Sequence, residues 1–413
     1  MMLTGQNGIL TRANQAKENT GTAQTEELVK LSVTDALTQG LGSLTDENLK
    51  TSLNNNIGNG KYTITGNETN GWIIAVNEKE FKVNSTGNVA NFGGWKANDT
   101  NTEFTKGYIT LKIGDYVNYS CTDGVDTAEE VEGKTIYTST SDKNGYSDQK
   151  FKLTDYTGKW QVLGVDENGY LQLISSDIIA PNSASYYRLQ GQNGYVNGVS
   201  ELDKISSLYG QGKYAKSARS INVDDVNKIT GYKDDNYYAG TRNVGQTGNE
   251  VTYTLNADGK VHYQGTKYPT SDTTGSYTSF TYWTGAEWKS LASGENVTIK
   301  HNYYNYYPQT LTTTSGSGST IKNLEREAST KAYNLIFGKY YWLGSQYSRA
   351  IMDYVYFGLH YVFNGYVSGG GLCYSYGDPY INSSGVRAVV SLKSEIQITR
   401  EYETENTPWI LGE

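Results

Sequence analysis

The apolar positions of the first hundred residues change from helical to strand-like spacing. Between Leu28 and Leu37 they recur every three or four residues, and Gly40 follows them. Side chains at that spacing lie on one face of a helix, and glycine often ends one. A second short helix is predicted after Thr45, because a threonine side chain can cap the free amide groups of a first turn. Residues 61–83 alternate between apolar and polar positions around Asn/Gly turns, which predicts two or three strands.

Beyond residue 107 most of the chain has the pattern of short strands. Residues 160–175 and 251–265 each contain two apolar-rich runs separated by an Asn-Gly or Asp-Gly pair. Such pairs adopt the positive φ angles that tight hairpin turns require, so both segments are predicted to be hairpins. Three short helices are predicted among the strands, beginning after Ser200, after Asn222 and at Leu324.

These patterns together predict an α+β fold in four parts. Residues 1–90 are expected to form a helix-rich unit with a small antiparallel sheet. A polar, turn-rich linker is predicted at residues 91–107, a large unit at residues 108–400 and a tail at residues 401–413.

Composition and charge narrow the classes of function. The chain has 413 residues and a net charge of −8. A nucleic-acid-binding groove needs a basic face, so we expect no nucleic-acid partner. The two cysteines, Cys121 and Cys373, are too few for a disulfide framework or a four-cysteine zinc site, and a single bridge between them stays open. No apolar run approaches the roughly 20 residues of a membrane-spanning helix, so the chain as given is expected to be soluble.

Residues that could carry out catalysis are few and scattered. The three histidines, His262, His301 and His360, stand alone, without an HExxH motif or the Cys/His spacing of a zinc site. The Gly-rich stretches lack the complete pattern of a phosphate-binding loop. We therefore predict that the chain is not an enzyme and uses neither a cofactor nor a metal.

The segment from Tyr347 to Gly385 differs in composition from the rest of the chain. It contains no Lys, Glu, Gln or Trp and a single Met, although Lys and Glu are common elsewhere. A surface segment of this length ordinarily carries several long charged side chains. The residues present are mostly those reached by changing the first two bases of an Asn codon that ends in a pyrimidine. Tyrosine is frequent in the segment, and the whole chain has 37 Tyr against 8 Phe.

Specific motifs lie in and around this segment. Residues 341–345 read YWLGS, residues 357–359 read FGL, and residues 385–392 read GVRAVVSL. Together with residues 160–175 and 219–232, they resemble the variable proteins of diversity-generating retroelements. In that family a template repeat is copied into the gene while its adenines are randomised, so that Asn codons vary most.

The sequence departs from the family pattern at several positions. The family usually has Ala where Gly344 stands, and Arg near Gln346 and His360. Gln346 and Met352 are not reachable from a randomised pyrimidine-ending Asn codon. These two positions are therefore not products of that mutagenesis.

The resemblance implies a C-type-lectin fold over residues 108–400, with a ligand-binding variable region at about 346–385. Alternate apolar residues are expected to form its core: Phe357, Leu359, Val362, Val367 and Leu372. Their neighbours are expected to be exposed contacts for an unknown protein or glycan ligand: Tyr347, Arg349, Ile351, Asp353, Tyr354, Tyr356, His360, Tyr361, Phe363, Asn364, Tyr366, Ser368, Gly369, Gly370, Tyr374, Tyr376, Asp378, Tyr380, Ile381 and Asn382. Antibody loops favour the same Tyr, Ser, Gly and Asn residues, because Tyr adds rigid contact area and the small residues adapt.

The N-terminus resembles a different family. Residues 3–20 are similar to the stretch that follows the apolar segment of type IV pilin-like proteins of gut Firmicutes. Those relatives carry a leader and about twenty apolar residues first. The resemblance implies that such a membrane segment is missing before Met1 and that the N-terminal helix contacts other pilin subunits. The expected location is the cell surface, in association with a pilus.

Three other functions remain as alternatives. A calcium-dependent lectin needs several convergent oxygen ligands, and the Glu-Pro-Asn and Trp-Asn-Asp signatures are missing. An oxidase related to formylglycine-generating enzymes would need neighbouring cysteines, whereas Cys121 and Cys373 lie in unrelated contexts. A purely structural pilus subunit would leave the tyrosine-rich segment unexplained.

Overall fold

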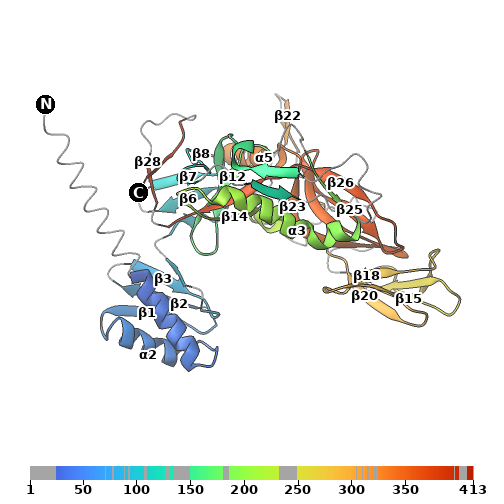
Figure 1. The fold of residues 1–413 in the computed structure, drawn as a ribbon, viewed down its shortest axis with the longest axis horizontal. Helices are drawn as coiled ribbons and strands as arrows, with labels where there is room; N and C mark the ends of the chain where they lie inside the picture. The colour runs from blue at the N-terminus through green and yellow to red at the C-terminus, as the bar shows by residue number, and fades with distance from the viewer. Residues whose placement is uncertain are drawn as a thin grey trace.

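Figure 1 shows the computed structural model of the chain. It describes residues 25–69, 71–76, 79–87, 89–91, 94–106, 109–125, 130–133, 149–179, 186–231, 249–303, 305–308, 310–313, 316–319, 321, 324–394, 396–399 and 407–412. The N-terminal stretch at residues 3–20, for which a resemblance to pilins was noted, lies outside these ranges. The described helices and antiparallel sheets make the fold α+β, as predicted.

The N-terminal unit combines two helices with a four-stranded antiparallel sheet (Figure 1). One helix covers residues 25–39, and α2 (Asp46–Asn56) follows it. The Thr45 side chain caps α2 as expected, because it accepts a hydrogen bond from the Asn48 amide at 3.3 Å. Val33, Leu53 and Trp72 belong to a hydrophobic core separate from that of the rest of the chain. The strands, in their order across the sheet, are β1 (Tyr62–Asn67), β2 (Gly71–Val76), β3 (Lys79–Val83) and β4 (Val89–Asn91).

A five-stranded antiparallel sheet forms the centre of the large unit. Its strand order is β14 (Ala215–Ser220), β27 (Ala388–Leu392), β12 (Leu171–Ser175), β11 (Trp160–Val165) and β8 (Tyr116–Val117). The hairpin predicted at residues 160–175 is confirmed as β11 and β12. The apolar residues of the motif at 385–392 form β27, which pairs on both edges and whose apolar side chains are buried.

Three helices accompany this sheet: α3 (Gly191–Ser207), α4 (Val223–Thr230) and α5 (Arg326–Phe337). The starts predicted for α4 and α5 agree with the structure to within two residues. The prediction that α3 begins after Ser200 is wrong, because the helix already starts nine residues earlier. Its early glycines are packing positions. A Cβ atom on Gly198 would lie 3.0 Å from side-chain carbons of Leu189 and Leu359, so only glycine lets α3 approach the neighbouring strands so closely.

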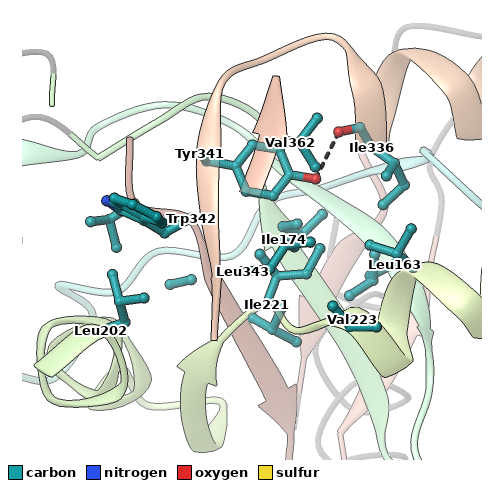
Figure 2. Close-up of a cluster of buried hydrophobic side chains, with 14 of the residues drawn as sticks. Leu163, Ile174, Leu202, Ile221, Val223, Ile336, Tyr341, Trp342, Leu343 and Val362 are labelled. Carbon is teal, nitrogen blue, oxygen red and sulfur yellow. Dashed lines mark hydrogen bonds between the residues drawn. The ribbon is translucent and has the colours of Figure 1, made fainter. Parts of the chain in front are cut away.

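A second antiparallel sheet packs against α3 and carries the predicted variable region. It consists of β23 (Tyr341–Ile351), β24 (Tyr354–Phe363) and β25 (Tyr366–Tyr374), paired in chain order. The Trp342 amide donates to the Gly385 carbonyl at 2.9 Å, which ties the start of this sheet to the segment leading into β27. Figure 2 shows Trp342, Tyr341 and Leu343 in the shared core, with the Tyr341 hydroxyl bonded to the Ile336 carbonyl at 2.7 Å.

Residues 249–303 form a β-rich segment, here called the inserted module, whose strands β15, β18 and β20 lie beyond one end of the main body in Figure 1. The predicted hairpin at residues 251–265 is confirmed as β15 (Glu250–Leu255) and β16 (Val261–Gly265). It belongs to a larger sheet with the order β17 (Thr273–Thr274), β16, β15 and β20 (Asn296–Lys300). A further hairpin pairs β18 (Thr281–Trp283) with β19 (Trp288–Ser290).

Two predicted connecting segments instead contain packed structure. The expected linker at 91–107 places Trp95 and Phe104 in the core of the large unit, because its few apolar residues turn inward between polar turns. In the expected tail, Leu411 is buried in the same core. The remaining strands are β5 (Lys96–Ala97), β6 (Glu103–Lys106) and β7 (Ile109–Lys112) in one sheet, and the pairs β9 (Glu130–Gly133) with β10 (Gln149–Lys152), β13 (Tyr187–Gln190) with β26 (Ile381–Ser384), β21 (Thr310–Thr313) with β22 (Gly316–Ser319), and β28 (Gln397–Thr399) with β29 (Ile410–Gly412).

Candidate ligand-binding surface

The apolar residues predicted to support the variable region are all buried. Phe357 and Leu359 point from β24 into the core, and Val362, Val367 and Leu372 join them there. Phe357 meets Trp288 of the inserted module edge-on, with ring centroids 5.2 Å apart. This part of the sequence-based assignment is confirmed.

Trp342 of β23 is the largest buried side chain of this sheet. It is 1% exposed, and its indole nitrogen donates to the Tyr187 carbonyl at 2.8 Å. Gly370 lies directly against the ring, so that a Cβ atom there would be 2.7 Å from Cζ3 of Trp342. Gly370 is therefore a packing position, and its predicted role as an exposed contact is wrong.

Three more predicted contact residues are buried, and each is covered from outside the variable region. Asp353 accepts hydrogen bonds from the backbone amide and the hydroxyl of Ser276, the latter at 2.8 Å, and from the Tyr277 amide at 3.3 Å. Asp353 thus attaches the inserted module to the β23–β24 turn. The prediction that Asp353 is exposed is wrong, because the side chain is buried and its carboxylate accepts these hydrogen bonds.

Tyr347 and His360 are covered by Tyr303, at the end of the inserted module. The Tyr303 ring lies 4.9 Å from that of Tyr347 and is stacked on that of His360 at 6.0 Å. We call these three residues the buried aromatic cluster. Burial lowers the pKa of His360 to about 4 and raises that of Tyr347, so both side chains are neutral near pH 7. The prediction that Tyr347 and His360 are exposed contacts is wrong, because Tyr303 covers both side chains.

Four predicted contact tyrosines gather near the β23–β24 turn, together with Tyr277 of the inserted module. We call the group of Tyr277, Tyr354, Tyr356, Tyr374 and Tyr376 the tyrosine cluster; its rings are half-buried. Cross-strand partners Tyr356 and Tyr374 have centroids 4.3 Å apart, and Tyr374 stacks on Tyr376 at 4.8 Å. Burial is the main cause that raises the pKa of Tyr354 to about 12, and a hydrogen bond with Tyr356 adds to it.

A second half-open aromatic group lies near the β24–β25 turn. Phe363 contacts Tyr361 at 5.5 Å, while Tyr366 stacks on Tyr307 at 4.3 Å. Tyr361 also packs on Trp342 at 5.8 Å, which links this group to the core. Asn364 is exposed in the turn itself.

The remaining predicted contacts are spread around these two groups. Asp378, Tyr380 and Ile381 are exposed, and Tyr380 meets Tyr374 edge-on at 6.1 Å. Asn382 is half-buried, because its amide nitrogen donates to the Gly371 carbonyl at 2.6 Å. The other half-buried members are Arg349, Ile351, Ser368 and Gly369.

Charge at this surface is sparse. The guanidinium of Arg349 lies over the Tyr303 ring at 4.5 Å, a cation–π contact. Within the part of the chain that the structure describes, no group of three His, Cys, Asp or Glu side chains could hold a metal ion. The surface can therefore offer aromatic area and hydroxyl groups, with few ionic contacts.

The two cysteines are unpaired and buried. Burial raises the pKa of Cys121 to about 11 and raises that of Cys373 as well, which disfavours the reactive thiolate in both. The bridge left open by the sequence is not formed.

Three residues of the surface, Tyr277, Tyr303 and Tyr307, were not found by sequence reasoning. Tyr277 and Tyr303 lie on the inserted module, whose predicted hairpin carried no sign of where it would dock. The aromatic runs SYTSFTYW at residues 276–283 and HNYYNYY at residues 301–307 are signals that could have indicated a contact surface there.

Comparisons of the chain with protein-family models, with curated proteins and with solved structures return no match. Of the described helices, none combines the length and the apolar character needed to cross a bilayer.

Proposed function

We propose that this protein is a surface-displayed receptor or adhesin whose binding surface is diversified by a retroelement. The observation that carries the proposal is the tyrosine cluster, a continuous group of half-exposed rings on a sheet whose apolar positions are core. Tyrosine provides large, rigid contact area at a low cost in conformational entropy, so such a group suits recognition of another molecule.

The arrangement of β24 supports a site that varies without unfolding its support. Val355, Phe357 and Leu359 are buried, whereas the alternating Tyr354 and Tyr356 are half-exposed. Since successive side chains of a strand point to opposite faces, changes at one set leave the other set in place. Such separation is what mutagenesis of a binding surface requires.

Pilus association and the C-type-lectin and pilin-like folds remain parts of this proposal. They rest on the motifs at 341–345 and 385–392 and on the N-terminal stretch. The exposed Leu28 and Leu31 on the helix at residues 25–39 are compatible with a contact to other subunits. We further propose that the protein has no catalytic activity.

The retroelement assignment is tested by the DNA around the gene. We expect a near-copy of the codons for residues 341–392 that differs almost only at template adenines, and a reverse transcriptase gene close to it. Neighbouring DNA without such a repeat would remove diversification from the proposal.

Binding is tested with arrays of cell-surface proteins and of glycans. A variant with Tyr354, Tyr356 and Tyr374 replaced by Ser should lose the signals that the parent chain gives, because central aromatic residues dominate most interfaces. A matched control replaces Tyr186, which is 45% exposed outside the sheet. Signals that survive the triple replacement would place the binding site elsewhere.

A further inference from the structure

Tyr277 enters the tyrosine cluster from outside the predicted variable region. Its ring is stacked on that of Tyr376, with centroids 4.2 Å apart and planes at 4°, and it meets Tyr354 edge-on at 5.7 Å. The Tyr277 amide donates to the carboxylate of Asp353, and its carbonyl accepts from the Val261 amide at 2.8 Å. The backbone on both sides of this ring is therefore held in place.

The inserted module is also hydrogen-bonded to the strands that carry the cluster. The Thr281 amide donates to the Ser375 carbonyl at 2.5 Å, and the Tyr253 hydroxyl donates to the Tyr354 carbonyl at 3.3 Å. These bonds involve main-chain carbonyls, so they persist whichever side chains occupy positions 354 and 375. Tyr277 thus keeps its place beside a surface whose other members belong to the predicted variable region.

The stacking determines which parts of the rings are free. Tyr277 and Tyr374 lie 4.2 Å and 4.8 Å from Tyr376, both nearly parallel to it. Two rings so close to the same face would overlap each other, so they occupy opposite faces. Tyr376 therefore offers a partner its edge and hydroxyl group and no open face.

At Tyr376, this geometry favours one of two classes of partner. The C–H groups of a sugar are attracted to the negative face of an aromatic ring, which must be open to receive them. Ring edges and hydroxyl groups instead match the mixed apolar and hydrogen-bonding surface of a protein. Sparse charge around the cluster agrees with an interface held by contact area and neutral hydrogen bonds.

We infer that Tyr277 is a fixed contact residue of the binding surface and that the partner is a protein. The inference rests on the proposed function, since it adds an invariant residue and a partner class to the same surface. The inserted module then provides a constant part of every binding site, while the strands β24 and β25 provide the variable part.

The test uses the full chain and random linear peptides displayed on phage, enriched on the parent protein, with a glycan array in parallel. Retention of the enriched pool is measured for Tyr277→Ser, Tyr277→Phe and Tyr356→Ser. The matched control is Tyr268→Ser, which removes a tyrosine of the same module that is 58% exposed. Thermal unfolding of each variant separates loss of binding from loss of fold.

We expect Tyr277→Ser and Tyr356→Ser each to reduce retention about tenfold or more, because both rings contact the peptide. Tyr277→Phe should reduce it several-fold through loss of the hydroxyl group, and it decides the outcome if Tyr277→Ser does not fold. Tyr268→Ser should change it less than about twofold.

Unchanged retention by both Tyr277 variants, together with a loss in Tyr356→Ser, would overturn the inference alone. Unchanged retention by Tyr356→Ser would overturn the proposed function itself. If no peptide pool is enriched, or if the parent binds a glycan in a way that depends on Tyr277, the assignment of a protein partner is wrong.

Discussion

The tyrosine cluster and the buried aromatic cluster belong to the same three-stranded sheet, yet their surroundings are opposite. Tyr356 and Tyr374 are half-exposed, whereas Tyr347 is 2% exposed beneath Tyr303. All three tyrosines come from the same unusual segment and have the same side chain. The difference comes from the inserted module, which covers one group and contributes only Tyr277 to the other. Exposure in this segment is thus decided by what packs on the sheet.

Trp342→Ala should cause the largest loss of stability, because it removes a ring that is 1% exposed and packs against Gly370 and Tyr361. We expect the free energy of unfolding to fall by roughly 3–5 kcal/mol, the usual cost of deleting a large buried aromatic side chain. Chemical denaturation followed by circular dichroism measures it. Tyr380→Ala, at a residue 51% exposed, is the control and should cost less than about 0.5 kcal/mol. A loss below about 1 kcal/mol for Trp342→Ala would mean that the ring is not part of the supporting core.

Acid should destabilise the buried aromatic cluster selectively. Burial, aided by the nearby charge of Arg349, lowers the pKa of His301 to about 4. Burial alone lowers the pKa of His360 to about 4. The unfolded chain takes up these protons already below about pH 6.5, and the folded chain only near pH 4. Stability is therefore complete above pH 6.5 and falls as the pH decreases, by about 2 kcal/mol per histidine at pH 5.

The dependence is measured by urea unfolding between pH 7.5 and pH 4.5. A variant with Gln at both histidine positions should show a flatter profile over this range, since glutamine takes up no proton. An equally steep profile in that variant would assign the acid sensitivity to other groups. Variants of the tyrosine cluster leave both histidines in place, so they should keep the parent profile.

Asp353→Asn should loosen the attachment of the inserted module. The substitution removes a charged acceptor for Ser276 and Tyr277, and we expect a loss of about 1–3 kcal/mol. Hydrogen exchange should increase at residues 275–281 and leave β11 and β12 unchanged. Unaltered exchange at residues 275–281 would show that the module is held without this carboxylate.

Replacing Tyr354, Tyr356 and Tyr374 by Ser should affect stability least for each residue changed. Half-exposed positions usually change it by about 0.5 kcal/mol each, and lost ring contacts add a similar amount. The thermal midpoint is expected to fall by a few degrees while binding is lost. Tyr361→Ser is a useful comparison, because the Tyr361 ring packs on Trp342. This variant should lose more unfolding free energy than any one of the three replacements. Failure of the triple variant to fold would make the tyrosine cluster part of the core.

Much of the support for this surface could be predicted from the sequence. The alternation at Phe357, Leu359 and Val362 indicated buried positions, and the structure confirms each one. Local turn and cap signals were also sufficient for the hairpin at 160–175 and for the start of α4 at Asn222. Such signals depend on neighbours in sequence, so they can be recognised without knowledge of distant contacts.

The sequence by itself determined the α+β character, the apolar positions of β24 and the unusual composition of the segment predicted to vary. Only the tertiary structure decided which side chains of that segment remain accessible. Asp353 is buried by Ser276 and Tyr277, and His360 by Tyr303, across sequence separations of more than fifty residues. Periodicity reports the two faces of a strand, but the docking of an inserted module depends on contacts between segments whose pairing has no local signature. For that reason the twenty predicted contact residues divide into a covered and an accessible set only in the folded protein.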